Sequence, residues 1–285
     1  MPFVTLGGVE LQYDVIGDRG PWVAAVSSAR FSHVDMLPLA HALARHGRRV
    51  VVHDRRNCGQ SSLWFDTTGA EDEVWADDLR AVLDHLGIDD VLVTGLSRGA
   101  RVAAQFAARH RRITRSAVLW GLTGGVAAYE HLDEYYFGQY LRACEAGGMD
   151  AVCAIDHFLG VLRARPENES VLRSLPPERF VEVMQSWRRA WADRDHVAVL
   201  GLPDDLLAAI RVPVAVVPCY DRLHPISAAE HAVGVMRRAT LFDFDPSRRA
   251  DDRRASDDVE VVAAIIAEFD DGGGRRRRRW FTRSG

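Results

Sequence analysis

The chain contains no lysine, so arginine supplies all 36 of its basic residues, and 40 acidic residues leave a net charge of −4. Such a balance creates no overall field that would attract a polyanion. It argues against nucleic acid and against a membrane surface as partners. A block of five arginines lies at 275–279, and we expect residues 272–285 to form a disordered basic tail.

Cysteine is also scarce. The four cysteines, Cys58, Cys144, Cys153 and Cys219, are widely spread and match neither a disulfide framework nor a metal-binding spacing. We therefore expect reduced thiols, no metal site and no cofactor. No signal peptide is evident at the N-terminus and no apolar run reaches the length of a membrane span. These absences predict a cytoplasmic protein.

The most informative stretch runs from Val91 to His110. An apolar strand leads into Gly95-Leu96-Ser97-Arg98-Gly99, and an alanine-rich helical segment follows. G-x-S-x-G between a strand and a helix is typical of a nucleophile elbow, a sharp turn that raises the serine above a sheet. Gly95 and Gly99 suit a turn where strand and helix nearly touch. The amide of Arg98, at the start of the helix, would then face a developing oxyanion.

The rest of the chain alternates short apolar strands with amphipathic helices, which predicts an α/β fold with a mostly parallel sheet. The predicted strands are 3–6, 9–13, 22–26, 49–53, 91–93, 116–120, 212–217 and 240–244. Between 126 and 210 the pattern is helical throughout, with prolines at 166, 176 and 177. We therefore predict a core from 1–125 and 211–271, interrupted by a helical cap at 126–210.

Three features together resemble one known superfamily. They are the elbow, the loop Asp54-x-Arg56-Asn57-Cys58-Gly59-x-Ser61, and the helical insertion before the last two strands. Over residues 1–270 the chain resembles the α/β-hydrolases that carry a cap, namely the proline-iminopeptidase-like, epoxide-hydrolase-like and C–C-hydrolase-like branch. The resemblance implies the α/β-hydrolase fold, a mostly parallel central sheet flanked by helices with an inserted all-helical cap. It also implies Ser97 as nucleophile and Asp221, after the penultimate strand, as the acid.

The chain departs from this superfamily at two places. A His-Gly pair usually follows the strand equivalent to 22–26, where a backbone amide completes the oxyanion hole, but this chain has Ser27-Ser28. Because the donor is backbone, an amide of Ser28 or of Ala29 meets the requirement, and Ser28 is the predicted donor. The usual base is a histidine in the loop after the last strand. The corresponding segment, 245–254, contains none, and His231 is the last histidine in the chain.

Without a base, a serine hydroxyl is a weak nucleophile at neutral pH. Three histidines are alternatives for this role. His224 lies three residues after Asp221 and is the first choice, His33 follows the predicted oxyanion loop, and His157 lies on a cap helix. For His224 the competing interpretation is a loop residue at the start of the next helix. His33 and His157 are also candidates for substrate contacts.

Aromatic residues are frequent in the predicted cap. Tyr136, Tyr140 and Trp187 would cover a pocket above Ser97 and favour an apolar substrate. The competing interpretation is that these rings only pack cap helices against one another.

The sequence supports three hypotheses for function. The first is an enzyme that hydrolyses an ester, lactone or similar bond in a small apolar molecule, with Ser97 as nucleophile and a non-standard base. The second is a lyase, cyclase or isomerase of specialised metabolism that uses the same pocket for proton transfer. The third is a ligand-binding protein with an incomplete triad. A homodimer is among the assemblies that the sequence allows.

Overall fold

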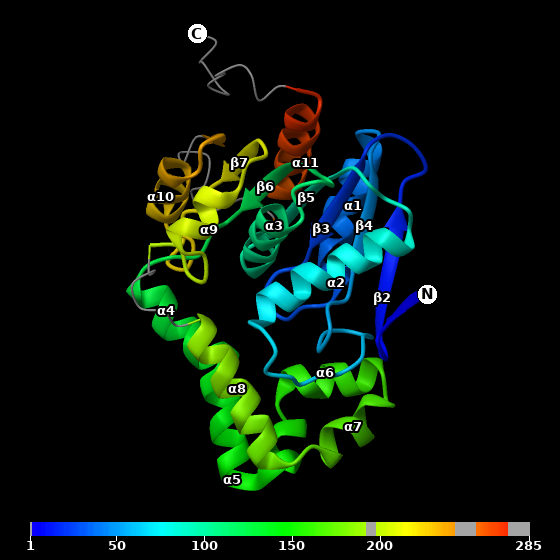
Figure 1. The fold of residues 1–285 in the computed structure, drawn as a ribbon, viewed down its shortest axis with the longest axis vertical. Coiled ribbons are helices and arrows are strands. Elements are labelled where there is room, and N and C mark those ends of the chain that lie inside the picture. Colours follow the sequence, from blue (N-terminus) through cyan, green and yellow to red (C-terminus); the bar gives the residue numbers. More distant parts are fainter. Residues whose placement is uncertain (1, 192–197, 243–254, 273–285) are drawn as a thin grey trace.

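The computed structural model describes residues 2–191, 198–242 and 255–272, with the side chains of 255–258 outside this description. These residues contain an eight-stranded sheet in the order β1-β2-β4-β3-β5-β6-β7-β8 (Figure 1). The strands β1, β2 and β4 pair antiparallel, and every other pairing is parallel. The strand bounds are β1 Phe3–Leu6, β2 Val9–Ile16, β3 Trp22–Val26, β4 Arg49–His53, β5 Val91–Leu96, β6 Thr114–Trp120, β7 Val214–Val217 and β8 Ala239–Leu241. This architecture confirms the predicted α/β class.

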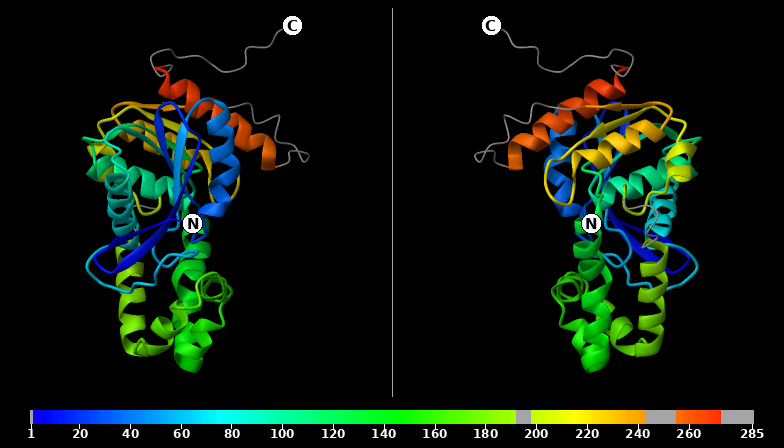
Figure 2. Two further views of the ribbon diagram at one scale, coloured as in Figure 1. Left: turned by 90° about the vertical axis from the view of Figure 1, so that its right-hand side faces the viewer. Right: turned by 90° about the vertical axis from the view of Figure 1, so that its left-hand side faces the viewer.

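Helices cover both faces of the sheet (Figures 1 and 2). On the inner strand β3, Val23 and Ala25 are buried with helices α1 (Leu37–Arg45) and α11 (Ala255–Asp270), whereas Ala24 and Val26 are buried with α2 (Glu71–His85) and α3 (Arg98–Arg109). Successive side chains point to opposite faces, so a strand covered on both sides is apolar at every position. The helices of the core are α1 Leu37–Arg45, α2 Glu71–His85, α3 Arg98–Arg109, α10 Ile226–Val235 and α11 Ala255–Asp270, with a short 3₁₀ helix η1 at His33–Met36.

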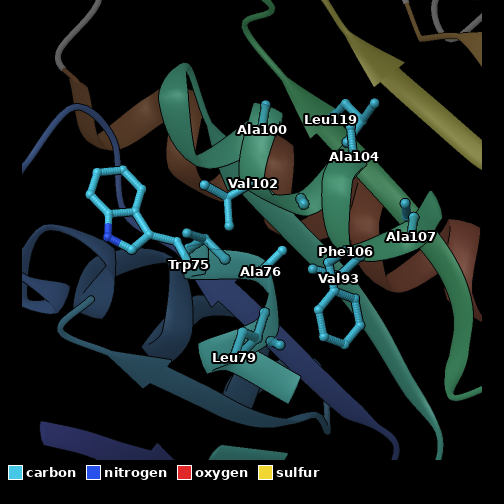
Figure 3. Packing of buried hydrophobic residues seen from close by; sticks show 14 of the residues in the cluster. Trp75, Ala76, Leu79, Val93, Ala100, Val102, Ala104, Phe106, Ala107 and Leu119 are labelled. Atoms are coloured by element: carbon cyan, nitrogen blue, oxygen red, sulfur yellow. The ribbon is translucent and has the colours of Figure 1, made fainter. Parts of the chain in front are cut away.

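The helix that follows the predicted nucleophile, α3, packs on α2. Figure 3 shows Trp75, Ala76 and Leu79 of α2 beside Val102 and Phe106 of α3 in one buried cluster. Small alanines on α3 allow a close approach to the sheet, and the large apolar side chains fill the space between the two helices. This packing fixes the direction in which α3 leaves β5.

A second set of helices extends away from one end of the sheet (Figures 1 and 2). It follows β6 and comprises α4 Val126–Asp133, the π-helix η2 Glu134–Gly138, α5 Gln139–Cys153, α6 Asp156–Ala164, α7 Asn168–Ser174 and α8 Pro177–Trp191. These helices share their own apolar cluster. We call this unit, residues 126–191, the cap.

The next helix, α9 at Asp204–Ala209, does not belong to the cap. Its Leu207 is buried in the core cluster with α10, and Figure 1 shows α9 and α10 side by side. The helical pattern extends to residue 209, but the part that packs away from the sheet ends earlier than the predicted boundary at 210. Helical periodicity alone does not indicate which neighbour a helix packs against.

The C-terminal predictions are only partly covered by the structure. Strand β8 ends at Leu241, and residues 243–254, with the predicted end of that strand and the loop that lacks histidine, lie outside the described residues. The predicted tail lies outside them from residue 273 onwards. Among the helices of the described part, none combines the length and apolar character needed to cross a membrane.

Candidate active site

Ser97 lies in the turn between β5 and α3. Its backbone has φ 57° and ψ −115°, a left-handed conformation that non-glycine residues rarely adopt. The amide of Ser97 donates to the carbonyl of Trp120 on the neighbouring strand over 2.9 Å. Such a strained backbone persists only where the surroundings hold it, and strained residues cluster at functional sites.

The two glycines of the motif are required by close contact. A Cβ on Gly95 would lie 2.4 Å from the carbonyl carbon and oxygen of Gly99, and a Cβ on Gly99 would lie 2.2 Å from the carbonyl oxygen of Val26. Backbone atoms cannot move aside as a flexible side chain can. The spacing of the two glycines therefore reflects the crossing of β5, α3 and β3 at one point.

We expect Gly99→Ala to destabilise the protein by about 2–3 kcal/mol, because the added methyl group overpacks a site bounded by backbone. Urea unfolding would measure this change. The matched control is Gly160→Ala in α6, where a Cβ would meet nothing within 4 Å. That control should gain up to about 1 kcal/mol, as alanine does relative to glycine in a helix. Equal stability of the two variants would contradict the packing argument.

The sheet order brings a distant loop to Ser97. In the parallel register Leu96 of β5 pairs with Trp120 of β6, and Trp120 pairs with Val217 of β7. The carboxyl ends of the three strands therefore align, and neighbouring strands are about 4.8 Å apart. The loop that follows Val217 consequently begins beside the nucleophile turn, although 127 residues separate Ser97 from His224.

Ser97, His224 and Asp221 form a continuous hydrogen-bonded chain. The Oγ of Ser97 lies 2.9 Å from Nε2 of His224, and Nδ1 of His224 lies 2.9 Å from both carboxylate oxygens of Asp221. An ionised carboxylate only accepts hydrogen bonds, so Nδ1 carries the proton, and Nε2 presents its lone pair to the serine hydroxyl. This arrangement has the geometry of a nucleophile, a base and an acid that orients the base.

The acid and the base come from one short loop. Oδ1 of Asp221 also accepts the amides of Leu223 at 2.8 Å and His224 at 2.9 Å. Burial of the carboxyl would raise its pKa, but these amides and the imidazole together lower it below its usual value. The side chain of Asp221 remains 58% exposed, whereas that of His224 is only 14% exposed. The imidazole is thus covered while its partner carboxylate stays in contact with solvent.

The predicted oxyanion donors lie on two sides of this turn. Arg98 is the first residue of α3, so its amide has no acceptor within the helix. Ser28 follows β3, and the next residue, Ala29, has φ 41°. The Nη2 of Arg55 donates to Oγ of Ser27 at 3.0 Å and to the carbonyl of Ser28 at 3.1 Å. A buried guanidinium therefore holds the loop that carries the predicted second donor.

His33 lies outside the triad. Its Nδ1 is 2.9 Å from Oδ1 of Asp54, and its Nε2 is 3.0 Å from Oδ2 of Asp14. Burial would lower the pKa of this imidazole, but the two carboxylates raise it above its usual value. Both ring nitrogens are thus already bonded, so His33 links β2 to the loop after β4 instead of serving as the base for Ser97 or as a free contact for substrate.

Two of the predicted substrate contacts line one cavity between the cap and the core. Tyr140 and His157 border a space of about 570 Å³, together with Arg30, Phe31 and Gln60. Burial, and the positive charge of Arg30 next, lower the pKa of His157. His157 therefore remains a neutral ring at neutral pH.

The other two aromatic predictions lie elsewhere. The ring of Tyr136 is buried against the guanidinium of Arg98, 4.5 Å from its centroid. Trp187 borders a smaller cavity of about 150 Å³. Ser97 lines neither this cavity nor the larger one, and 7% of its surface is exposed. The three aromatic residues of the predicted cover, Tyr136, Tyr140 and Trp187, therefore do not line one shared cavity of these two.

A buried histidine in the core makes stability depend on pH. His53, at the end of β4, is fully buried, and burial followed by the charge of Arg55 lowers its pKa to about 3. Between about pH 6.5 and pH 3 the unfolded chain binds a proton that the folded chain does not bind. The contribution of His53 to the free energy of unfolding should therefore fall by up to about 1.4 kcal/mol per pH unit on acidification.

Urea unfolding between pH 7 and pH 5 would measure this slope, and His53→Leu should reduce it by that amount. The control is His41→Gln, which changes an exposed histidine of α1 and should leave the slope unchanged. An unaltered slope in His53→Leu would contradict this assignment.

Sequence reasoning missed a group of buried charges behind the elbow. The group consists of Arg30, Arg55, Arg98, Arg101, Glu71 and Asp72. The only local signal was Arg98 and Arg101, three residues apart in an alanine-rich helix. The carboxylates that pair with them come from α2, so no local pattern connects the two.

A family model for the alpha/beta hydrolase fold matches residues 27–146. The curated relatives include the non-heme haloperoxidase of Rhodococcus erythropolis, 35% identical over 111 residues, which are 39% of each chain. They also include a proline iminopeptidase of Lactobacillus helveticus, 30% identical over 107 residues, or 36% of this chain and 35% of that protein. The chain thus matches less than two fifths of the length of these relatives.

Solved structures cover much more of the chain. Est816, an N-acyl homoserine lactone degrading enzyme, is 22% identical and covers 95% of this chain and 99% of its own, with a TM-score of 0.59. The enol-lactonase from Burkholderia xenovorans LB400 is 20% identical and covers 94% of this chain and 100% of its own, with a TM-score of 0.60. At such low identities the likeness concerns the fold, which is that of the α/β-hydrolases.

Proposed function

We propose that this chain is a serine hydrolase of the α/β-hydrolase superfamily that cleaves an ester or lactone bond in a small apolar molecule. The observation that carries the proposal is the chain of hydrogen bonds from Ser97 through His224 to Asp221. Those three residues have the types and distances that acyl transfer requires.

In the proposed reaction, Oγ of Ser97 attacks the carbonyl carbon while Nε2 of His224 takes the hydroxyl proton. The amides of Arg98 and Ser28 stabilise the oxyanion. The imidazolium returns its proton to the leaving alkoxide as the C–O bond breaks, which leaves an acyl group on Ser97. Water, deprotonated by the same imidazole, then releases the acid and restores the serine. Asp221 holds the imidazole in the reactive tautomer throughout.

The relatives support the choice of bond. Besides the N-acyl homoserine lactone degrading enzyme and the enol-lactonase named above, the similar proteins include a bifunctional esterase/perhydrolase of Acinetobacter calcoaceticus, 38% identical over 66 residues, or 23% of each chain. The exposed side chains of Phe31 and Val34 and the partly exposed ring of Tyr135 border the larger cavity next to the predicted oxyanion loop. Exposed apolar side chains near that loop favour an apolar substrate. The proposed reaction needs no cofactor.

The two other hypotheses, a non-hydrolytic enzyme and a ligand-binding protein, arose because the loop after the last strand lacks the usual base histidine. A lyase, cyclase or isomerase would not need an activated serine, and a binding protein would not need a triad. Because Nε2 of His224 lies within hydrogen-bonding distance of Ser97, that motivation is weaker, and hydrolysis is the function we propose. A non-hydrolytic enzyme would convert its substrate without consuming water.

A substrate panel tests the proposal. Purified protein would be assayed with p-nitrophenyl esters of increasing acyl length and with γ-lactones, and acid release would be followed by titration. We expect kcat/KM to rise by up to about four-fold for each further CH₂ group that is buried. No hydrolysis above that of a Ser97→Ala preparation with any ester or lactone would overturn the proposal.

A further inference from the structure

The loop after β3, residues 27–31, lies between two other loops at the same edge of the sheet. In the strand order β4-β3-β5, Arg55 follows β4 on one side of this loop and Ser97 follows β5 on the other (Figure 1). Val26 pairs with Gly95 of β5, so the loop leaves the sheet level with the nucleophile turn. The peptide groups of the loop can therefore face either the β4 side or the β5 side.

The guanidinium of Arg55 binds the loop through its acceptors. Its Nη2 lies 3.0 Å from Oγ of Ser27, 3.1 Å from the carbonyl oxygen of Ser28 and 3.4 Å from that of Phe31. The side chain is fully buried and stacks on Trp75, 4.3 Å from the ring centroid. A charged donor thus fixes the carbonyl of Ser28 toward the β4 side.

The peptide that joins Ser28 to Ala29 must then present its N–H on the opposite side. In a planar trans peptide the C=O and N–H bonds point in opposite directions. The amide of Ala29 therefore faces the β5 side, where Ser97 lies. Ala29 is only 8% exposed, and within the described part of the chain its amide donates to no acceptor. Unpartnered buried amides are rare, so this N–H is available to a bound oxyanion.

The amide of Ser28 points the other way. A Cβ on Gly99 would lie 2.2 Å from the carbonyl oxygen of Val26 and 2.7 Å from that of Ser27, so both oxygens face the first turn of α3. The N–H of Ser28 shares a peptide with the carbonyl of Ser27 and hence points away from α3. The geometry therefore favours Ala29 as the second oxyanion donor over Ser28, which was predicted from the sequence.

This orientation of the loop is strained. Ala29 has φ 41°, in the positive region that residues other than glycine seldom adopt. Turning the Ser28–Ala29 peptide by half a rotation would return Ala29 to negative φ, but its N–H would then face the β4 side. The bond from Arg55 to the carbonyl of Ser28 opposes this rotation, and so does the amide of Phe31, which donates to the same carbonyl at 3.1 Å.

The loop has a second anchor that does not depend on Arg55. Arg30 donates from Nη2 to Oε2 of Glu71 at 2.7 Å, and Arg98 donates to the same oxygen at 2.6 Å. One carboxylate oxygen thus joins the loop to the residue that supplies the other oxyanion amide. Loss of Arg55 would consequently leave the loop in place and release one peptide within it.

We propose that Arg55 is a positioning residue for the proposed hydrolysis. It holds the Ser28–Ala29 peptide so that the amide of Ala29, together with that of Arg98, donates to the oxyanion. The inference rests on the proposed function and refines its second donor. Arg55 acts through a peptide group and not on the substrate. Because a misdirected donor weakens binding of the transition state more than binding of the ester, its loss should lower kcat and not raise KM.

The variant Arg55→Met tests this proposal with the best ester of the panel. It should lower kcat by about 10–10²-fold while KM stays within about three-fold of the parent, since one oxyanion donor is lost from part or all of the molecules. Nε and Nη1 of Arg55 lack partners among the described residues, so removal of this buried charge should leave Tm unchanged or higher. A parental kcat, or a loss confined to KM, would overturn the proposal.

A second substitution separates peptide orientation from general packing. Glycine adopts positive φ without strain, so in an Ala29→Gly background the peptide needs less support. The loss of kcat caused by Arg55→Met should therefore be at least about five-fold smaller in that background than in the parent. An equal loss in both backgrounds would mean that Arg55 supports only the packing of the loop, and would overturn the proposal.

The control is Arg101→Met, which removes another arginine of the same buried group. None of its guanidinium nitrogens has a hydrogen-bond partner among the described residues, and it should keep kcat within about two-fold. An equal loss in Arg101→Met and Arg55→Met would overturn the proposal, because buried charge alone would then explain both. If Arg55→Met does not fold, Arg55→Lys, whose side chain is shorter, should lose at least about five-fold in kcat, and a parental value would overturn the proposal.

The same assays separate this inference from the proposed function. A parent protein that hydrolyses no ester or lactone above the Ser97→Ala preparation would contradict both. An active parent with an equally active Arg55→Met would contradict the role of Arg55 alone and leave the proposed hydrolysis intact.

Discussion

Replacing Ser97 with alanine is expected to lower kcat/KM for activated esters by about 10⁴-fold or more, because the attacking oxygen is removed and only binding and oxyanion stabilisation remain. Alanine preserves the backbone requirements of the turn, so the protein should stay folded. Steady-state kinetics with the best ester of the panel would measure the loss, and thermal unfolding would verify the fold.

The matched control for this variant is Ser174→Ala, which removes an exposed hydroxyl at the end of α7. It should keep the full activity of the parent. If Ser97→Ala kept an activity within ten-fold of the parent, the serine mechanism would be excluded. The position of Ser97 beside His224 would not alter that conclusion.

Replacing His224 with alanine is expected to lower kcat/KM by about 10³-fold or more, because the serine loses its general base. The double variant Ser97→Ala, His224→Ala should be hardly worse than either single variant, since the two residues act as a unit. Added imidazole should restore part of the activity of His224→Ala, because the substitution leaves space for a free base beside Ser97.

Asp221→Asn should also lower kcat/KM, by up to about 10⁴-fold, because an amide no longer holds the imidazole in the reactive tautomer. The control for both variants is His231→Ala, which changes the last histidine of the chain, bound to Asp204 on the surface at 2.7 Å. Full activity in His224→Ala, or an equal loss in His231→Ala, would contradict the assigned base.

The architecture could be predicted because its signals are local. Strands buried on both faces are apolar at every position, and the helices that cover them are apolar at intervals of three and four residues. The nucleophile elbow could be predicted for the same reason, since its strand, turn and helix are contiguous in the sequence. Asn57 in the loop after β4 has φ 67°, the left-handed region that its residue type tolerates.

The candidate triad could be predicted from the sequence only in part. Asp221 and His224 are three residues apart and follow one strand, so their proximity could be inferred. The distance from His224 to Ser97 depends on the strand order β5-β6-β7, which the sequence does not specify. The positions of Tyr136, Trp187 and His33 depend on partners far along the chain, and so does the pairing of Arg98 with Glu71.

Covalent labelling of Ser97 tests the central claim most directly. The parent protein would be treated with a fluorophosphonate, digested, and the modified peptide identified by mass spectrometry, with His224→Ala treated in parallel. We predict one adduct per chain, on Ser97, formed at least about 10²-fold faster in the parent than in the variant. A parent protein that forms no adduct at Ser97, or forms it no faster than His224→Ala does, would contradict a serine activated by that histidine.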